Sequence, residues 1–229
     1  MTAALFDLTP PEIPAGALRR SEWKVRPLGV EAATRLVVAH HYLHRPGPCS
    51  FAWSLTRAND ATPLGVITYG TPSSAPLRRG IAGDEHANNV IELTRLWIDD
   101  AVPKNGESFL IGNTVRRVDK EIVVSFADAS QGHLGYVYQS TNWLYTGLSA
   151  KRTDWTVEGI EKHGQTWADK YTADEMREQF GEAFTIEPRA RKHRYVFLNC
   201  NRRRRHELLA ALRYPVQPYP KAPAGGEVA

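Results

Sequence analysis

The stretch SFADASQGHLGYVYQSTNWLYTG, residues 125–147, places polar and aromatic side chains directly after an apolar segment that reads as a buried strand. Asp128 closes that segment, and a carboxylate there can accept a proton or hold an amine; the alternative role is a cap for the following turn. Tyr138 serves either the same site or the core through one buried hydrogen bond. Trp143 is typical of a core, although its ring can also stack on a flipped base.

Three histidines and a tyrosine lie together in HHYLH, at the end of a predicted helix. His40 and His44 have the i, i+4 spacing with which one face of a helix can bind a metal ion. The motif lacks the glutamate of HExxH, and no acid stands nearby in the sequence, so no metal is assigned. His40, His41 and Tyr42 are candidates for contact with DNA or substrate, and the alternative is an ordinary surface.

Tyr69, Arg95 and Ser108 complete the candidate catalytic residues, in the motifs VITYG, LTRLW and NGES. An arginine that points inward from a strand needs an anion, because burying a lone guanidinium is costly. We expect Asp128 to be that partner. The alternation along LTRLW also permits a solvent-facing Arg95.

The segment RARKHRYVFLNCNRRRRH, residues 189–206, holds seven arginines, one lysine and no acid, within a chain of net charge +4. These cations repel one another unless an anion lies against them; a solvated charged surface is the ordinary alternative. Phosphate backbone is the natural partner. The residues assigned to nucleic-acid contacts are Arg202, Arg203, Arg204 and Arg205.

The 229 residues are 42% hydrophobic and 24% charged, which suits a single globular domain. Residues 1–20 are expected to form a flexible arm and residues 214–229 an extended tail. No apolar run reaches the roughly 20 residues of a membrane helix, and the amino terminus does not resemble a signal peptide. We therefore expect a cytoplasmic protein with no membrane partner, and a dimer is compatible with the sequence. Two cysteines, Cys49 and Cys200, fit a reducing compartment and are too few for a four-cysteine zinc site.

Periodicity predicts alternating strands and helices. The predicted helices are 31–45, 108–121, 172–181 and 202–213, with a helix or helical turn at 135–145. The predicted strands are 51–57, 63–70, 91–98, 121–128 and 194–199. Residues 71–85 are predicted to be a long loop. The continuous apolar run before Asp128 indicates a strand buried on both faces.

This order of elements resembles that of the GNAT acyltransferases. The resemblance implies an α/β (α+β) fold in which a central mixed, mostly antiparallel sheet is flanked by helices. It also implies that the amino end of the helix after the fourth strand holds a cofactor pyrophosphate. Those cofactor-binding positions are Lys104, Asn105, Gly106 and Ser108. The family pattern R/Q-x-x-G-x-G/A is richer in glycine than VPKNGES, so the cofactor stays open between an acyl-CoA-type donor, another donor and a metal ion.

The GNAT resemblance also bears on the catalytic residues. It places Asp128 where the acyl donor meets its acceptor, and Tyr138 where a general acid often protonates the leaving group.

Several motifs in one order also resemble the Mom family of phage DNA-modification proteins, over about residues 35–221. They are HHYLHRPGP, the strand pair ending VITYG, ELTRLWIDD, KNGESFLIG, SFADASQGHLGYVYQSTNWLYTG and LRYPVQPYPK. The resemblance implies an enzyme that converts the N6 of adenine in duplex DNA to an acetamido-type (carbamoylmethyl) group and so protects phage DNA from host restriction.

Such an enzyme has to flip the adenine out of the stack, because N6 is paired inside the duplex. The candidate aromatic walls for the flipped base are Tyr42, Tyr69, Tyr138 and Trp143. Two other functions stay open at this point. One is a GNAT acyltransferase that acts on RNA, protein or a small amine, and the other is a non-catalytic DNA-binding protein.

Overall fold

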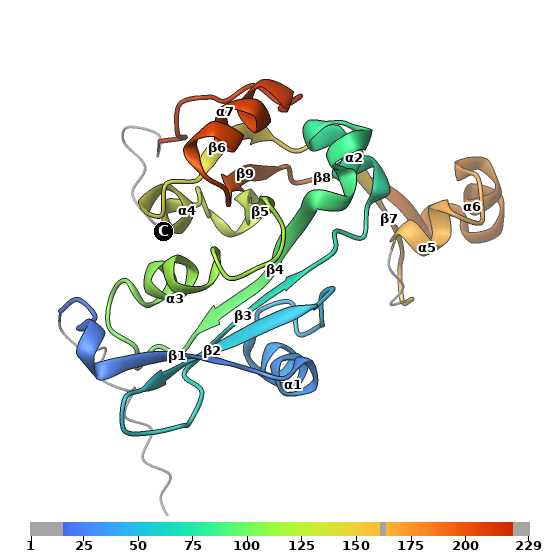
Figure 1. Cartoon of the computed structure of the whole chain (residues 1–229). Coiled ribbons are helices and arrows are strands. Elements are labelled where there is room, and N and C mark those ends of the chain that lie inside the picture. Colours follow the sequence, from blue (N-terminus) through green and yellow to red (C-terminus); the bar gives the residue numbers. More distant parts are fainter. Residues whose placement is uncertain (1–15, 161–163, 222–229) are drawn as a thin grey trace, which may run out of the picture.

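The computed structural model describes residues 16–160 and 164–221, and a seven-stranded sheet runs through them (Figure 1). The spatial order of the strands is β1 (Trp23–Pro27), β2 (Phe51–Arg57), β3 (Gly65–Gly70), β4 (Val90–Ile98), β5 (Ile122–Asp128), β9 (Lys192–Leu198) and β6 (Leu144–Leu148). Each neighbouring pair is antiparallel except β4 with β5, which is parallel. The predicted mixed, mostly antiparallel sheet is confirmed.

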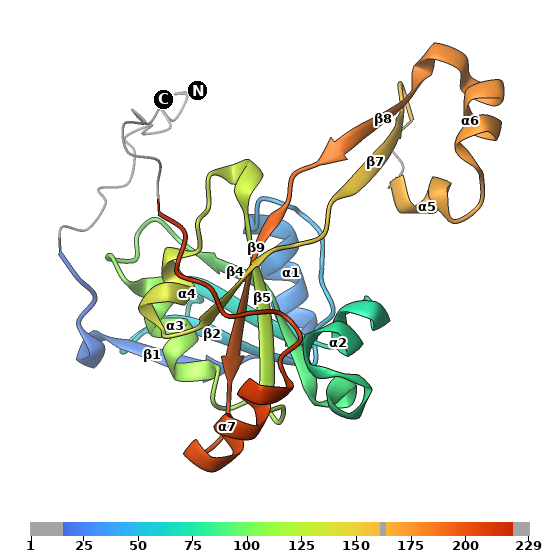
Figure 2. The same ribbon diagram turned by 90° about the horizontal axis from the view of Figure 1, so that it is seen from above.

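Helices cover both faces of this sheet. α3 (Gly106–Thr114) and α4 (Tyr136–Ser140) lie on one face, and α1 (Val30–His40) and α2 (Ala75–Ala82) lie on the other (Figure 2). α7 (Arg202–Ala211) packs through Leu208 into the same cluster as Ile81 of α2. The central strand β5 serves both layers, since Val123 packs toward α3 and Val124 toward α2 and α7. The predicted burial of this strand on both faces is confirmed.

β4 and β5 pair only at their beginnings. Residues 90–92 are in register with 122–124, and beyond that point no strand pairing joins the two. β4 also carries an extra residue, because Leu93 lies opposite Tyr69 whereas Arg95 lies opposite Thr68. Such a bulge shifts the alternation of side chains by one and often re-aims them beside a site. Leu93 and Leu96 consequently both pack toward α3, which leaves Glu92 and Arg95 on the opposite face.

A second, two-stranded sheet projects away from the first (Figures 1 and 2). It consists of β7 (Arg152–Val157) and β8 (Phe184–Arg189), with α5 (Gly164–Ala168) and α6 (Ala173–Phe180) between them. Its own small core holds Val157, Trp167, Met176 and Phe184. The sequence predicted α6, which Thr172 and Glu175 cap reciprocally, but neither strand.

Four predicted boundaries were wrong. The expected helix at 108–121 begins at Gly106 and already ends at Thr114. The expected loop at 71–85 contains α2, which Ser74 caps by accepting a hydrogen bond from the Leu77 amide. The expected helix at 135–145 ends at Ser140, because Asn142 adopts a left-handed turn conformation (φ 62°) and β6 begins two residues later. α1 ends at His40, five residues before the predicted end.

The carboxyl-terminal tail follows an extended course over β6 as far as residue 221. The Gln217 amide donates to the Tyr145 carbonyl at 2.9 Å, and the Tyr219 hydroxyl donates to the Trp143 carbonyl at 2.7 Å. Arg194 lies over the ring of Tyr214, 3.4 Å from its centroid. Most of the expected amino-terminal arm and residues 222–229 of the tail lie outside the described residues. In the part that is described, no helix has the length and apolar character needed to cross a bilayer.

Candidate active site

The opening between β4 and β5 forms a pocket of about 560 Å³. Its walls come from the second half of β4, the end of β5, the turn and first residues of α4, and the segment that follows α1. Five predicted site residues meet there: His41, Tyr42, Arg95, Asp128 and Tyr138. The pocket therefore unites residues up to 97 positions apart in the sequence, from 41 to 138.

Asp128 is held in place by three contacts. Its Oδ2 forms an ion pair with Lys192 Nζ at 2.7 Å, and its Oδ1 accepts from the amide and the hydroxyl of Ser130 at 3.1 and 2.6 Å. Partial burial opposes ionisation, but the hydrogen bonds from Lys192 and Ser130 outweigh it and lower the pKa of Asp128. The carboxylate is charged at neutral pH and is a strong acceptor for an amine. The predicted turn cap is also present, through the Ser130 amide.

The predicted ion pair between Arg95 and Asp128 was wrong. The Arg95 guanidinium instead donates to the carbonyls of Arg45 at 3.2 Å, Pro46 at 3.1 Å and Thr94 at 2.6 Å. The Arg45 and Pro46 carbonyls belong to the segment after α1, which has no helical partners for them, and the guanidinium fork satisfies both. Arg95 thus fastens the segment that carries His41 and Tyr42 onto β4.

Tyr138 enters the pocket from the α4 side, with its hydroxyl 2.8 Å from Ser125 Oγ. The Ser125 hydroxyl donates its proton to the Leu93 carbonyl at 3.0 Å, so in the other hydrogen bond Tyr138 is the donor and Ser125 the acceptor. Burial raises the pKa of Tyr138 to about 12, which keeps the phenol protonated at neutral pH. Sequence reasoning did not select Ser125, although a serine inside the apolar run IVVSFA was a usable signal.

His41 is buried beneath Tyr42, with the two ring centroids 4.4 Å apart. Its Nδ1 accepts from the Leu43 amide at 3.1 Å, so Nε2 carries the proton of the neutral ring. Burial, reinforced by Arg95, His44 and Lys192, lowers the pKa of His41 to about 4. His41 is therefore a neutral hydrogen-bonding group and not a cation at pH 7.

His40 and His44 do not share a helix face, which corrects the predicted metal-binding spacing. α1 ends at His40, whose ring stacks on Trp97 at 4.3 Å. His44 has a left-handed backbone (φ 45°), and its Nδ1 lies 3.1 Å from the Val38 carbonyl. Over the described ranges, 16–160 and 164–221, no three His, Cys, Asp or Glu residues gather in a way that would hold a metal ion.

Two of the predicted aromatic walls belong to the core instead. Tyr69 is fully buried and bonds to Thr114 Oγ1 at 2.8 Å, and Trp143 is fully buried against Tyr138 and Phe197. Tyr42 and Tyr136, which also line the pocket, are 47% and 60% exposed and so present their rings to a ligand. Sequence reasoning missed Tyr136, since nothing in the spacing separated it from its core neighbour Tyr138.

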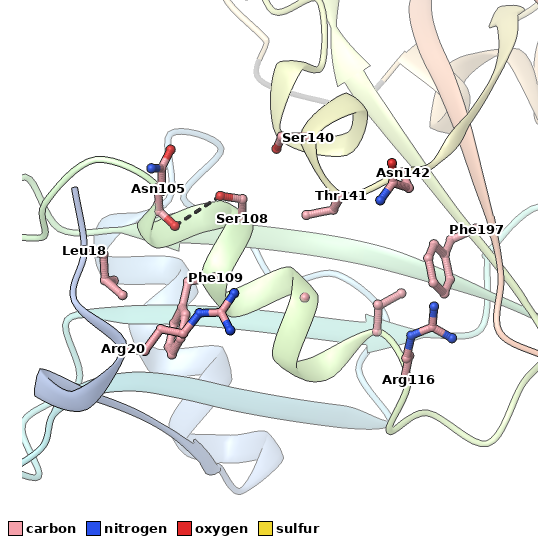
Figure 3. Close-up of a pocket in the computed structure, with 12 residues that line it drawn as sticks. Leu18, Arg20, Asn105, Ser108, Phe109, Arg116, Ser140, Thr141, Asn142 and Phe197 are labelled. Atoms are coloured by element: carbon pink, nitrogen blue, oxygen red, sulfur yellow. Dashed lines mark hydrogen bonds between the residues drawn. The ribbon is translucent and has the colours of Figure 1, made fainter.

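Two of the four predicted cofactor positions line a different groove, of about 620 Å³, on the α3 side (Figure 3). Asn105 and Ser108 lie at its rim, with Ser108 Oγ donating to the Asn105 carbonyl at 3.1 Å. Ser108 therefore stands apart from Asp128 and Tyr138. Lys104 is not among the residues that line either space, and Gly106 is required for packing, because a Cβ there would lie 2.6 Å from Val102 Cγ1.

This groove fits one anionic group better than it fits a glycine-loop cofactor. Arg20 and Arg116 line it, and none of the described residues that line it is acidic. Neither guanidinium pairs with a carboxylate within the described part of the chain, and Asn105 provides no side-chain cap to the described α3 helix. A pyrophosphate would meet one helix end and two arginines, without a surrounding nest of backbone amides.

We expect acetyl-CoA to bind only weakly, with a dissociation constant above about 1 µM. Isothermal titration calorimetry measures this directly. If the groove is the site, Arg20→Gln with Arg116→Gln weakens binding further, whereas the exposed neighbour Arg117→Gln does not. Tight sub-micromolar binding to the parental protein would contradict the expectation.

The arginine-rich segment 189–206 places its cations in two groups, at opposite ends of strand β9. Lys192 lies beside Asp128, whereas the other end of β9 pairs Leu198 with Ile122, and α7 follows from there. Six residues of strand separate the two ends by roughly 20 Å. Within α7, Arg204 is engaged by Glu121 at 3.1 Å and Glu207 at 2.9 Å. The four consecutive arginines are thus not equally available to a ligand.

Comparisons with known proteins agree with the motifs. A family model described as the Mom protein family matches residues 22–221. The methylcarbamoylase Mom of Escherichia phage Mu is 27% identical over 172 residues, which cover 69% of this chain and 67% of the phage protein.

Among solved structures, a ribosomal-protein-S5-alanine acetyltransferase from Vibrio fischeri superposes with a TM-score of 0.45 and 8% identity, covering 81% of this chain and 98% of its own. An N-acetyltransferase from Staphylococcus aureus Mu50 gives 0.43 and 13%, covering 78% and 99%.

Proposed function

The chain belongs to the Mom protein family, and on that premise we propose that it is a DNA-modifying transferase. The reaction proposed is the transfer of an acetamido-type (carbamoylmethyl) group to the N6 of adenine in duplex DNA, with protection from restriction as its consequence. The observation that carries the proposal is the β4–β5 pocket, in which Asp128, Lys192, Tyr138 and Arg95 are gathered inside the part of the chain that matches the family.

The pocket reaches both faces of the sheet, which suits a reaction between two separate molecules. Ser125 and Tyr138 belong to the α3 and α4 face, whereas strand alternation puts Asp128 and Lys192 on the other. Because β4 and β5 are unpaired beyond residues 92 and 124, the gap between them connects the two faces of the sheet. A donor on the Tyr138 side and an adenine on the Asp128 side would meet at this gap.

Each residue then has a defined task. The charged Asp128 accepts a hydrogen bond from the adenine amine. The protonated Tyr138 would exchange its bond to Ser125 for one to the group that leaves the donor. Tyr42, supported from below by His41, offers an exposed ring on which a flipped base can stack. A pocket of about 560 Å³ lies within the usual range for small-molecule sites.

Phosphates next to a flipped base would lie at the mouth of this pocket. Besides Arg95, whose guanidinium is committed to main-chain carbonyls, the nearby cations are Lys192 and Arg45, which is exposed close to Tyr42. Arg202 and Arg203 of α7 lie at the far end of β9, roughly 20 Å from Lys192. If β9 runs along the duplex, they would contact phosphates roughly six base pairs from the flipped adenine, because one strand residue and one base pair advance by a similar distance. Both groups fix the position of the enzyme without choosing the base.

The salt dependence of DNA binding measures how many α7 arginines take part. We expect the fourfold change of Arg202–Arg205 to glutamine to reduce the slope of log K against log salt by about one to two units, at about 0.9 per phosphate contact. Arg204 contributes little because its guanidinium is committed to Glu121 and Glu207. Single Arg202→Gln and Arg204→Gln variants provide the matched comparison. An unchanged slope in the fourfold variant would place α7 outside the DNA interface.

The modification itself is tested by mass. DNA from cells that express the protein is digested to nucleosides, and we expect a deoxyadenosine heavier by one carbamoylmethyl group. Unmodified nucleosides together with tight DNA binding would favour the non-catalytic alternative. Acetylation of a free amine with acetyl-CoA, and none on DNA, would favour an ordinary acyltransferase.

A further inference from the structure

Glu92 occupies the point at which β4 and β5 part. It is the last residue of β4 in register with β5, opposite Val124, and its side chain lines the floor of the pocket. Tyr42 and Asp128 line the same pocket, so a substrate held by them shares this space with the Glu92 carboxylate. Sequence reasoning did not select Glu92, since a single acid at the start of IELTRLWI carries no motif.

The carboxylate of Glu92 has no fixed partner. Across residues 16–160 and 164–221, no hydrogen bond or ion pair reaches it, although the positive charges of Arg95 and Lys192 act on it from a distance. Asp128, by contrast, has both oxygens occupied, by Lys192 and by Ser130. A half-buried acid without a partner costs stability, because water no longer solvates it fully and nothing in the fold compensates.

The two carboxylates therefore differ in their affinity for a proton. Burial raises the pKa of Glu92 to about 7, and Arg95 and Lys192 offset only part of the shift. The pKa of Asp128 lies below its usual value, for the reasons given above. Pairs of acids with divergent pKa values divide the work of catalysis, since a base is most effective when its pKa lies near the working pH. Asp128 is too acidic for that role.

We propose that Glu92 is the catalytic base of the proposed DNA modification, which removes the proton from the adenine N6 while Asp128, itself held by Lys192, keeps the amine in position. This inference rests on the proposed function. The other titratable or charged groups that line the same pocket are His41, Tyr42, Arg95, Glu107, Asp128, His133, Tyr136, Tyr138 and Lys192.

The step balances as a substitution at nitrogen. N6 uses its electron pair to form a bond with the carbon of an electrophilic carbamoylmethyl donor. The bond between that carbon and its leaving group breaks, and the leaving group departs with the pair and is protonated from the Tyr138 side. The proton lost by N6 moves to the Glu92 carboxylate and then to water. The amine of adenine needs such help, because its lone pair is delocalised into the ring.

The experiment compares Glu92→Gln with Glu187→Gln, an exposed acid on β8 outside the pocket. We expect Glu92→Gln to slow modification by about 10²-fold or more while duplex DNA still binds. The parental rate should rise with pH through about 7 and then level, and this limb should disappear in Glu92→Gln but persist in Glu187→Gln. Glu92→Asp retains a carboxylate one methylene short, so it should keep the limb at a lower rate.

Folding gives a second readout. The pKa of Glu92 is raised in the folded state, so its contribution to stability is greatest at low pH and declines as pH rises toward 7. At pH 8 the neutral glutamine should therefore leave the melting temperature equal or higher. A merely structural glutamate would show the opposite change.

Nuclear magnetic resonance of ¹³C-labelled glutamate separates this proposal from the proposed function. The Glu92 signal is identified by its loss in Glu92→Gln, and we expect it to titrate near pH 7 in the free protein. A midpoint below about 5 overturns the assignment, even in a protein that fails to modify DNA. If the parental protein modifies DNA, then an unchanged rate and pH profile in Glu92→Gln overturns it as well.

Discussion

Asp128→Ala is expected to lower the rate of DNA modification by about 10²-fold or more, in a protein that stays folded and still binds duplex DNA. The carboxylate is only 13% exposed and lies 2.7 Å from Lys192 Nζ, so its removal takes away the acceptor for the amine. It also leaves an ammonium group beside the adenine, where a second positive charge repels a developing cation. Asp128→Asn preserves the shape and should lose activity to a similar degree.

The matched control is Asp154→Asn, which breaks an ion pair with Arg189 at 3.5 Å outside the pocket. It should modify DNA at the parental rate. Nucleoside mass spectrometry gives the activity, circular dichroism the fold and a filter-binding titration the affinity for DNA. Parental modification by both Asp128 variants would remove Asp128 from the active site.

Arg95→Met is expected to lower both stability and activity, because three carbonyls lose their donor at once. Hydrogen bonds from a charged group are worth about 1.5–3 kcal/mol each when they are shielded from water. Two of these three bonds are exposed to solvent, which weakens them, so we expect a total loss of only roughly 2 kcal/mol in the free energy of unfolding. The freed segment at 41–46 no longer holds Tyr42 over the pocket. The apparent KM for DNA should rise as a result, and kcat should fall.

Arg95→Lys tests the geometry of this contact. A lysine keeps the charge but lacks the planar fork that meets the Arg45 and Pro46 carbonyls together, so it should rescue little. Arg26→Met is the control, since this strand arginine bonds to Thr56 Oγ1 at 3.2 Å, away from the pocket. Urea unfolding and proteolysis between residues 43 and 48 report the two effects. Resistance of the Arg95→Met segment to protease would show that other contacts hold it.

The sequence predicted those features of the site that are local in the chain. The apolar run before Asp128 identified both the central strand and the carboxylate at its end, and HHYLH identified the segment above the pocket. The sequence could not predict which side chains on neighbouring strands contact each other. The pairing of Asp128 with Lys192 depends on the register between β5 and β9, which periodicity does not determine.

Other misses have different causes. Arg95 was assigned a carboxylate because burial of a guanidinium demands an acceptor, but main-chain carbonyls met that demand equally well. Glu92 matters because it lies where β4 and β5 separate, and no sequence pattern near it predicts that point. α2 was a missed opportunity, because Ser74 followed by an early proline is an ordinary signal for a helix start.

The course of the carboxyl-terminal tail affects how copies of this protein behave toward one another. β6 is the last strand of the sheet, and its free edge would offer unpaired main-chain groups to any other extended chain. Gln217 and Tyr219 occupy part of that edge by bonding to the carbonyls of Tyr145 and Trp143. Residues 214–219 thus shield the sheet against edge-to-edge aggregation. A chain shortened after Leu212 would lose this shield, so we expect it to be less soluble although its active-site residues are unchanged.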